Sequence, residues 1–249
     1  MRALIVTAVT AEADSVVRGL SGPVPHPDHT PGPDHAPGSE PPRTLPGGYL
    51  IHRRGAFDVL VAGVGPAAAA AGTATALALA PTPDGYGLVV SAGIGGGFAP
   101  AAPIGSLVVA DAIVAADLGA ETPQGFLTVT ELGFGRSVHL PPAELAARAA
   151  EATGALLAPV LTVSTVTGTA ARTAALAARH PLAGAEAMEG FGVAEAAAAH
   201  GLAVLEVRAV SNAVGPRDRD AWRIGEALTA LADGFRALRP VLASWGGPP

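Results

Sequence analysis

The stretch AEAMEGFGVAEAAAAHGLAVLEVRAVSN, residues 185–212, decides the fold of this chain. Its pattern predicts a strand, a helix and a second strand in immediate succession. Glu189 lies where the first strand gives way to the helix. Asn212 lies at the end of the second strand, which reads as wholly apolar. Because ligands of an open α/β sheet bind outside the carboxyl ends of its strands, we expect Glu189 and Asn212 to face one crevice.

The same alternation of strands and helices runs through the rest of the chain. Further strands are expected at residues 3–7, 49–53, 58–62, 87–91, 105–116 and 156–164, and further helices at 10–20, 66–79, 141–152, 170–179 and 220–245. Pro240 is a point at which the last helix could break. The strand at 105–116 is long enough to bend around a partly closed barrel. The alternation predicts a doubly wound α/β fold in a single domain, residues 1–249.

Residues 21–46 differ in composition from everything around them. They hold nine prolines and the three histidines His26, His29 and His35. This composition predicts a loop insertion in the domain. The histidines match no spacing of metal ligands, so a solvated Pro-rich loop is favoured over a metal site.

The overall composition excludes several classes of function. The hydrophobic fraction is 49% and the aromatic fraction 4%, which predicts a core of small aliphatic side chains. The net charge of −6 argues against a nucleic-acid partner, and the lack of cysteine excludes disulfides and thiolate chemistry. Glu12 and Asp14 interrupt the apolar start too early for a signal peptide, and the Ala-rich run 66–80 is too short to span a membrane. We therefore expect a soluble cytoplasmic protein without a membrane partner.

Two features at strand ends have both a functional and a plain structural interpretation. The run SAGIGGG at 91–97 ends a buried strand, and we expect it to be a loop whose backbone N–H groups approach a ligand. A flexible turn is the alternative, and no G-x-G-x-x-G precedes a helix, so a dinucleotide cofactor is not expected. Glu12 lies in the first turn of a helix, where composition alone favours a surface carboxylate that stabilises the helix dipole.

Four segments carry a resemblance to a known family. They are SAGIGGGFAP, the following IGSLVVADAIVAAD, AMEGFGVAEAA and VRAVSNAVG. Together they resemble the glycine loop, barrel strand, Met-Glu motif and terminal active-site strand of the purine nucleoside phosphorylase and nucleosidase superfamily. The resemblance covers nearly the whole chain apart from the Pro-rich insertion. It implies a nucleoside-phosphorylase-like three-layer α/β/α fold with a central mixed, partly barrel-like twisted sheet, a nucleoside substrate, a homo-oligomer and no metal or organic cofactor.

The resemblance also implies roles for individual residues. Glu12 would hold and deprotonate an attacking water, Glu189 would accept hydrogen bonds from the ribose hydroxyls, and Asn212 would face N7 and the 6-position of the base. Other positions would bind the sugar, the purine ring or the attacking water: Ser91, Ala92, Gly93, Gly168, Thr169, Met188 and Arg208. These residue types suit the reaction, because N-glycosidic cleavage develops positive charge on the sugar and negative charge on the purine.

Two departures from the family pattern narrow the expected reaction. Nucleosidases of the family that cleave adenine have an aspartate where this chain has Asn212, and an amide suits a 6-oxopurine such as hypoxanthine instead. No Arg or Lys occurs between Arg54 and Arg136, where the family's phosphorylases usually place an arginine for phosphate. Water is therefore the expected nucleophile.

The expected reaction, in which water releases a 6-oxopurine, is similar to that of the futalosine hydrolase branch of the family. The segment SNAVGPRDRDAW resembles the C-terminal signature of that branch, whose substrate carries a carboxyphenyl group. Arg217 or Arg219 could pair with the carboxylate of such a substrate, although a solvated charge run that caps the last helix is the stronger interpretation. Trp222 reads as a packing residue of that helix. Two rival functions stay open: a phosphorylase of inosine or guanosine that binds phosphate through the backbone of 93–97, and a nucleoside-binding protein without catalytic activity.

Overall fold

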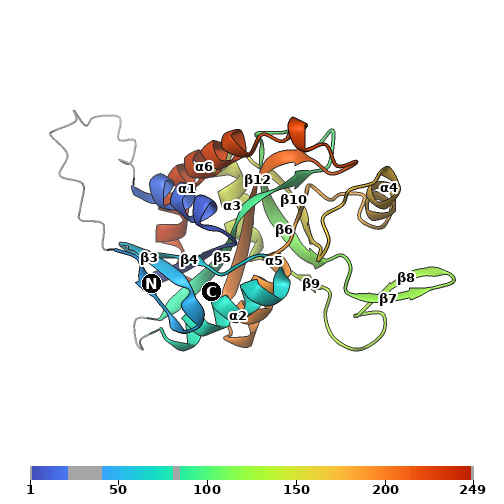
Figure 1. The fold of residues 1–249 in the computed structure, drawn as a ribbon. Coiled ribbons are helices and arrows are strands. Elements are labelled where there is room, and N and C mark those ends of the chain that lie inside the picture. Colours follow the sequence, from blue (N-terminus) through green and yellow to red (C-terminus); the bar gives the residue numbers. More distant parts are fainter. Residues whose placement is uncertain (1, 22–40, 81–84, 248–249) are drawn as a thin grey trace.

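The computed structural model describes residues 2–21, 41–80 and 85–247 (Figure 1). Most of the predicted Pro-rich insertion, with His26, His29 and His35, lies outside these ranges. The described end of the insertion forms a short strand, β2 (Arg43–Thr44), which pairs antiparallel with β3 (Leu50–Arg54). None of the described helices is long and apolar enough to cross a membrane.

A mixed sheet forms the centre of the molecule. Its strands run in the order β11-β10-β6-β12-β5-β1-β4-β3-β2, and β9 pairs with β6. The remaining strands of this sheet are β1 (Arg2–Thr7), β4 (Phe57–Val61), β5 (Tyr86–Gly97), β6 (Leu107–Ala115), β9 (Val138–His139), β10 (Leu156–Thr162), β11 (Ala185–Ala187) and β12 (Ala203–Ala213). β11 also pairs with β5, so β5, β12, β6, β10 and β11 close into a barrel. This confirms the expected mixed, partly barrel-like sheet.

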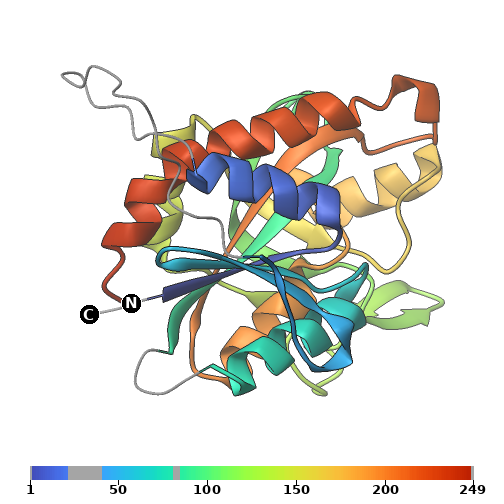
Figure 2. The ribbon, with the colours of Figure 1, turned by 60° about the vertical axis from the view of Figure 1, so that its left-hand side comes forward.

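Helices cover both faces of the sheet, as Figures 1 and 2 show. One layer contains α1 (Thr10–Ser21), α3 (Ala143–Thr153) and α6 (Ile224–Ser244), and the other contains α2 (Pro66–Ala78) and α5 (Gly190–Ala199). Alternate residues of β1 face opposite layers: Ile5 packs with the first set of helices, and Leu4 and Val6 pack with the second. The expected three-layer α/β/α architecture is therefore confirmed.

The remaining elements lie at one side of the barrel. α4 (Ala170–Arg179) is close to a separate two-stranded hairpin formed by β7 (Gly119–Thr122) and β8 (Gly125–Thr128). The last helix begins later than expected, because residues 219–221 form a short 3-10 turn, and Trp222 precedes the helix. Pro240 does not break it. Pro240 is exposed, so the carbonyl group that loses its partner one turn earlier can be hydrated.

The glycine run 91–97 belongs to a strand, so its prediction as a loop is wrong. β5 continues to Gly97, pairing with β12 on one edge and with β11 at its end. Its glycines are needed because other backbone segments pass close by: a Cβ atom on Gly95 would lie 2.7 Å from the Glu186 carbonyl oxygen, and one on Gly97 would lie 2.1 Å from the Ala102 carbonyl oxygen. The run therefore closes the barrel at positions where a side chain would collide with neighbouring backbone.

Candidate active site

Three acidic side chains and one arginine meet at the carboxyl ends of the central strands. β1 leads directly into α1, which carries Glu12 in its first turn, and β11 leads into Glu189, the residue before α5. β12 carries Glu206 and Arg208 on one face. Since β1, β5 and β12 are neighbours in the sheet, segments far apart in the sequence are brought together there.

Arg208 is the centre of this cluster and is completely buried. Its Nε atom lies 2.9 Å from Oε1 of Glu206, and its Nη1 atom lies 3.2 Å from Oε2 of Glu189. Its Nη2 atom donates to the Ser91 hydroxyl at 2.9 Å. Burial alone would lower the pKa of Arg208, but the carboxylates of Glu206, Glu189 and Glu12 raise it above its ordinary value. The guanidinium therefore stays charged and holds the acidic groups in place.

Glu12 points inward, although it lies in the first turn of a helix. Its residue is 4% exposed, so the interpretation as a surface carboxylate is wrong. Oε1 accepts the Ile94 N–H at 2.9 Å, and Oε2 accepts the Ala8 and Val9 N–H groups at 3.0 and 3.3 Å. Burial raises the pKa of Glu12, and the nearby Arg208 charge and the Ile94 N–H offset only part of this shift. A buried carboxyl with a raised pKa is suited to proton transfer.

Gly93 makes the approach of Glu12 and Arg208 possible. A Cβ atom on residue 93 would lie 2.6 Å from Glu12 Oε1 and 2.7 Å from Arg208 Nη1. The absence of a side chain at this point of β5 therefore defines where the acid and the arginine meet.

Glu189 is held by contacts on both of its oxygens. Oε1 accepts the backbone N–H of Gly65 at 3.2 Å, and Oε2 contacts Arg208. Gly65 has a φ angle of 92°, which a residue with a side chain adopts only under strain. A carboxylate has about four acceptor sites, so these two contacts leave acceptor capacity for a ligand. Met188, beside it, is half-buried.

Glu206 is a member of the cluster that the sequence pattern alone does not single out, because the strand that carries it reads as apolar. The residue is fully buried, and burial raises the pKa of its carboxyl group despite the Arg208 charge. Its Oε2 atom has no hydrogen-bond partner among the residues that the structure describes. The sequence does contain a signal: Glu206 and Arg208 are two residues apart in a strand, which places them on one face.

The end of the site predicted to read the base is built from two segments. In the loop before α4, the Thr167 N–H donates to Glu186 Oε1 at 2.8 Å, and its hydroxyl contacts the other oxygen of that buried carboxylate. Asn212 is half-buried at the end of β12, where its Oδ1 accepts from the Ser211 hydroxyl at 2.8 Å and its Nδ2 donates to the Ala213 carbonyl at 3.0 Å. Ser211 therefore orients the amide.

The other predicted binding residues occupy different surroundings. Gly168 is half-buried, while Thr169 is exposed and caps α4 by accepting the Arg172 N–H. The Ala92 side chain is packed in the core at 1% exposure, so only its backbone is available to a ligand. Arg217 donates its backbone N–H to the Gly168 carbonyl at 3.2 Å. Its guanidinium lies over the Trp222 ring at 5.3 Å, so Trp222 contacts this arginine.

Comparison with known proteins gives a consistent family. A family model described as the phosphorylase superfamily matches residues 52–238. A futalosine hydrolase of Streptomyces coelicolor is 63% identical over 247 residues, which cover 98% of this chain and 98% of that protein. A futalosine hydrolase of Acidothermus cellulolyticus is 46% identical over 248 residues, covering 96% of this chain and 90% of that protein.

The fold has counterparts among solved structures. The native structure of futalosine hydrolase of Helicobacter pylori superposes with a TM-score of 0.75 at 17% identity, covering 96% of this chain and 97% of that chain. At this identity the likeness concerns the fold alone.

Proposed function

Because the chain belongs to the phosphorylase superfamily, we propose that it hydrolyses the N-glycosidic bond of futalosine and releases hypoxanthine, a step in the futalosine route of menaquinone biosynthesis. The observation that carries this proposal is the full-length likeness to the Streptomyces coelicolor futalosine hydrolase. The predicted superfamily membership is confirmed, and the buried acidic cluster supports the proposed nucleosidase activity.

The reaction breaks the bond between C1′ of the ribose and N9 of the purine and forms a bond from C1′ to a water oxygen. Glu12 accepts a proton from that water, the electrons of the broken bond pass to the purine, and the purine takes a proton from solvent on N7 as it leaves. Glu12 then returns its proton to solvent. General base catalysis of this kind contributes about 10²–10⁴-fold to the rate. The raised pKa of Glu12 supports this role, because a base works best when its pKa approaches the working pH.

Charge around the sugar stabilises the transition state. In this proposal Glu189, and Glu12 before it takes up the proton, present negative charge to the oxocarbenium-like sugar as it forms. Glu189 binds the ribose hydroxyls with its remaining acceptor capacity. Ser91 does not touch the substrate in this proposal, because its hydroxyl is engaged by the buried Arg208.

The base is selected by Asn212 and by the backbone near Gly168 and Thr169. The amide donates to a carbonyl oxygen at the 6-position, and its own oxygen accepts from a protonated N7. The Ser211 hydroxyl supports this arrangement because it holds the amide in one orientation. A 6-amino group would face a second donor, which leaves buried polar groups unpaired and disfavours adenine nucleosides.

Arg217 is the proposed partner of the substrate's carboxylate, but its contacts within the protein also suit a purely structural role. Its contacts with Gly168 and Trp222 show that it anchors the loop before α4. If it also meets the carboxylate, Arg217→Gln should raise KM for futalosine by about tenfold while KM for inosine changes little. An equal change for both nucleosides would assign Arg217 to the loop alone.

The central test is a chromatographic assay of hypoxanthine release from futalosine and from inosine, each with and without phosphate. We expect release from futalosine that does not depend on phosphate, and little release from inosine. Glu12→Gln should abolish most of the release, with Asp14→Asn, an exposed acid of the same helix, as the matched control. Release from inosine only in the presence of phosphate would make the protein a phosphorylase, and binding without cleavage would make it a nucleoside-binding protein.

We also expect the enzyme to form a homo-oligomer in the cytoplasm. Several large apolar side chains support an interface, since Phe134, Leu140 and Leu182 are 82%, 74% and 78% exposed. Sedimentation analysis at micromolar concentration tests this expectation, and a monomer at every concentration would contradict it.

A further inference from the structure

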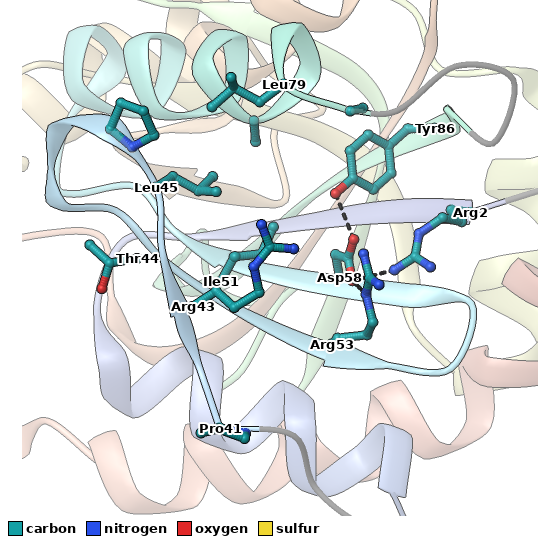
Figure 3. A pocket seen from close by; sticks show the side chains of 13 residues that line it. Arg2, Pro41, Arg43, Thr44, Leu45, Ile51, Arg53, Asp58, Leu79 and Tyr86 are labelled. Atoms are coloured by element: carbon teal, nitrogen blue, oxygen red, sulfur yellow. Dashed lines mark hydrogen bonds and ion pairs between the residues drawn. The ribbon is translucent and has the colours of Figure 1, made fainter.

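A cavity of about 280 Å³ lies at the opposite end of the sheet from the acidic cluster. Figure 3 shows it between β2, β3, the starts of β1 and β5, and the end of α2. Arg2, the first residue of β1, lines the cavity, whereas Thr7, five residues later, ends the strand near Glu12. At about 3.3 Å per residue the two strand ends are roughly 16 Å apart. A ligand in this cavity would not occupy the catalytic crevice.

One wall of the cavity is built around a buried carboxylate. The side chain of Asp58 is 4% exposed, and it forms ion pairs with Arg2 and, at 3.5 Å, with Arg53. The Tyr86 hydroxyl donates to its second oxygen at 2.6 Å. Burial and the neighbouring Asp58 raise the pKa of Tyr86, so the phenol stays a donor at neutral pH. The carboxylate of Asp58 is therefore already paired with protein groups and does not need a ligand to satisfy it.

The arginines of the cavity exceed what Asp58 neutralises. Arg2, Arg43 and Arg53 carry three positive charges against one carboxylate, a formal surplus of two in a chain whose net charge is −6. Arg43 points into the cavity from β2 and makes no hydrogen bond or ion pair within the described part of the chain (Figure 3). The C-terminal end of α2 adds only about half a negative charge. The surplus favours an anionic ligand.

The facing wall is apolar. Leu45 and Ile51 line it from the β-strand side, and Leu79 faces them from the end of α2. Leu79 is 52% exposed, so it offers apolar surface to a ligand. A bare inorganic anion would leave this apolar surface exposed to water, whereas a ligand with a hydrocarbon body would cover it.

We propose that this cavity is a second binding site, for a small carboxylate with an apolar ring or short chain. The carboxylate contacts Arg43 and Arg53, whose planar guanidinium groups match it in a bidentate way. The apolar body lies against Leu45 and Leu79. The cavity volume is near the lower limit for ligand sites, so the ligand is about the size of benzoate.

The test is a calorimetric or NMR titration of benzoate into the intact protein. Benzamide, which has the ring but no charge, and inorganic phosphate, which has charge but no apolar part, are titrated for comparison. We expect benzoate to bind in the millimolar range and both comparisons to bind more weakly. Arg43→Gln should lower the affinity for benzoate by about tenfold, because one charge-assisted contact is lost. Leu79→Ser should weaken it through loss of the apolar contact.

Arg136→Gln is the matched control, since Arg136 is an exposed arginine outside the cavity and the charge change is the same. Its affinity for benzoate should equal that of the unmodified protein. Equal affinity of Arg43→Gln and the unmodified protein would overturn the proposal, as would phosphate binding as tightly as benzoate. Displacement of benzoate by hypoxanthine, or by the other product of futalosine hydrolysis, would also overturn it, because it would place benzoate in the catalytic crevice. The titration needs no turnover, so its result is independent of whether futalosine is the substrate.

Discussion

A Cβ atom on Gly93 would lie 2.6 Å from Oε1 of Glu12, so this acid reaches the central strand only because residue 93 is glycine. The same atom would lie 2.7 Å from Arg208 Nη1. Both neighbours are the ends of long side chains, which can move aside. A substitution at Gly93 should therefore disturb the site more than the fold.

Gly93→Ala is expected to lower kcat by about 100-fold, because displacing a catalytic group by about 1 Å costs that much. The midpoint of thermal unfolding should change by only a few degrees. Gly225→Ala is the control, since a Cβ atom there meets nothing within 4 Å. A normal kcat for Gly93→Ala would show that the position of Glu12 does not limit the reaction.

The rate of the reaction should depend on the ionisation of Glu12. Burial raises the pKa of this carboxyl above its reference value of 4.5, and a general base must be ionised to act. We therefore expect kcat/KM to fall as the pH drops through a value above 4.5. A pH–rate profile of the unmodified protein and of Glu12→Gln measures this, and the acidic limb should disappear in the variant. An acidic limb that persists would belong to another group.

The same pKa shift has a consequence for stability. A carboxyl with a raised pKa in the folded state holds its proton more tightly there than in the unfolded chain. The stability gained from this tighter proton binding is fully present below pH 4.5 and is lost as the pH rises through the raised pKa of Glu12. Glu12→Gln should therefore be more stable than the unmodified protein at pH 8, and this difference should shrink toward pH 4. Urea unfolding at several pH values measures it, and a difference that does not vary with pH would contradict the assignment.

Removal of the buried arginine should be costly. Arg208→Gln leaves Glu206 and Glu189 without their cation, and breaking a buried ion pair in this way costs about 3–5 kcal/mol of unfolding free energy. Arg236→Gln is the control, because Arg236 pairs with Asp233 on the surface, where loss of a pair costs at most about 1 kcal/mol. Chemical unfolding compares the two, and equal losses would mean that the buried cluster adds no net stability.

The choice of base should depend on Asn212. Asn212→Asp replaces the donor that faces the 6-position by an acceptor, so a 6-amino group becomes the better partner. We expect the ratio of kcat/KM for inosine to that for adenosine to fall by at least about tenfold. Competition assays with both nucleosides give this ratio directly. An unchanged ratio would place the selection of the base in the loop at Gly168 and Thr169.

The fold and several of the groups in the site could be predicted from local patterns. Strand and helix periods do not depend on distant contacts, and the rule that ligands bind at the carboxyl ends of strands singled out Glu189. In the structure Glu12, Glu189 and Ser91 all lie close to Arg208. Their roles in catalysis stay predictions that the variants above test.

Other features depend on contacts between distant segments and could not be predicted in the same way. The glycine run 91–97 looks like a loop until β11 is known to cross its end. The burial and pairing of Glu206 depend on Arg208 and on the start of α5, where a Cβ atom on Gly190 would lie 2.2 Å from the Glu206 carboxylate. A charged pair two residues apart in an otherwise apolar strand was the one local indication of this buried cluster.

The position of β12 also affects how the protein is made. β12 is the last strand along the part of the chain that the structure describes, yet it lies in the middle of the sheet, between β5 and β6. Until it is synthesised, both neighbouring strands have unpaired edges and Glu12 has no guanidinium to face. Unpaired edges promote association between chains. We therefore expect the sheet to be completed only when β12 has been synthesised, and shorter nascent chains to associate through these edges.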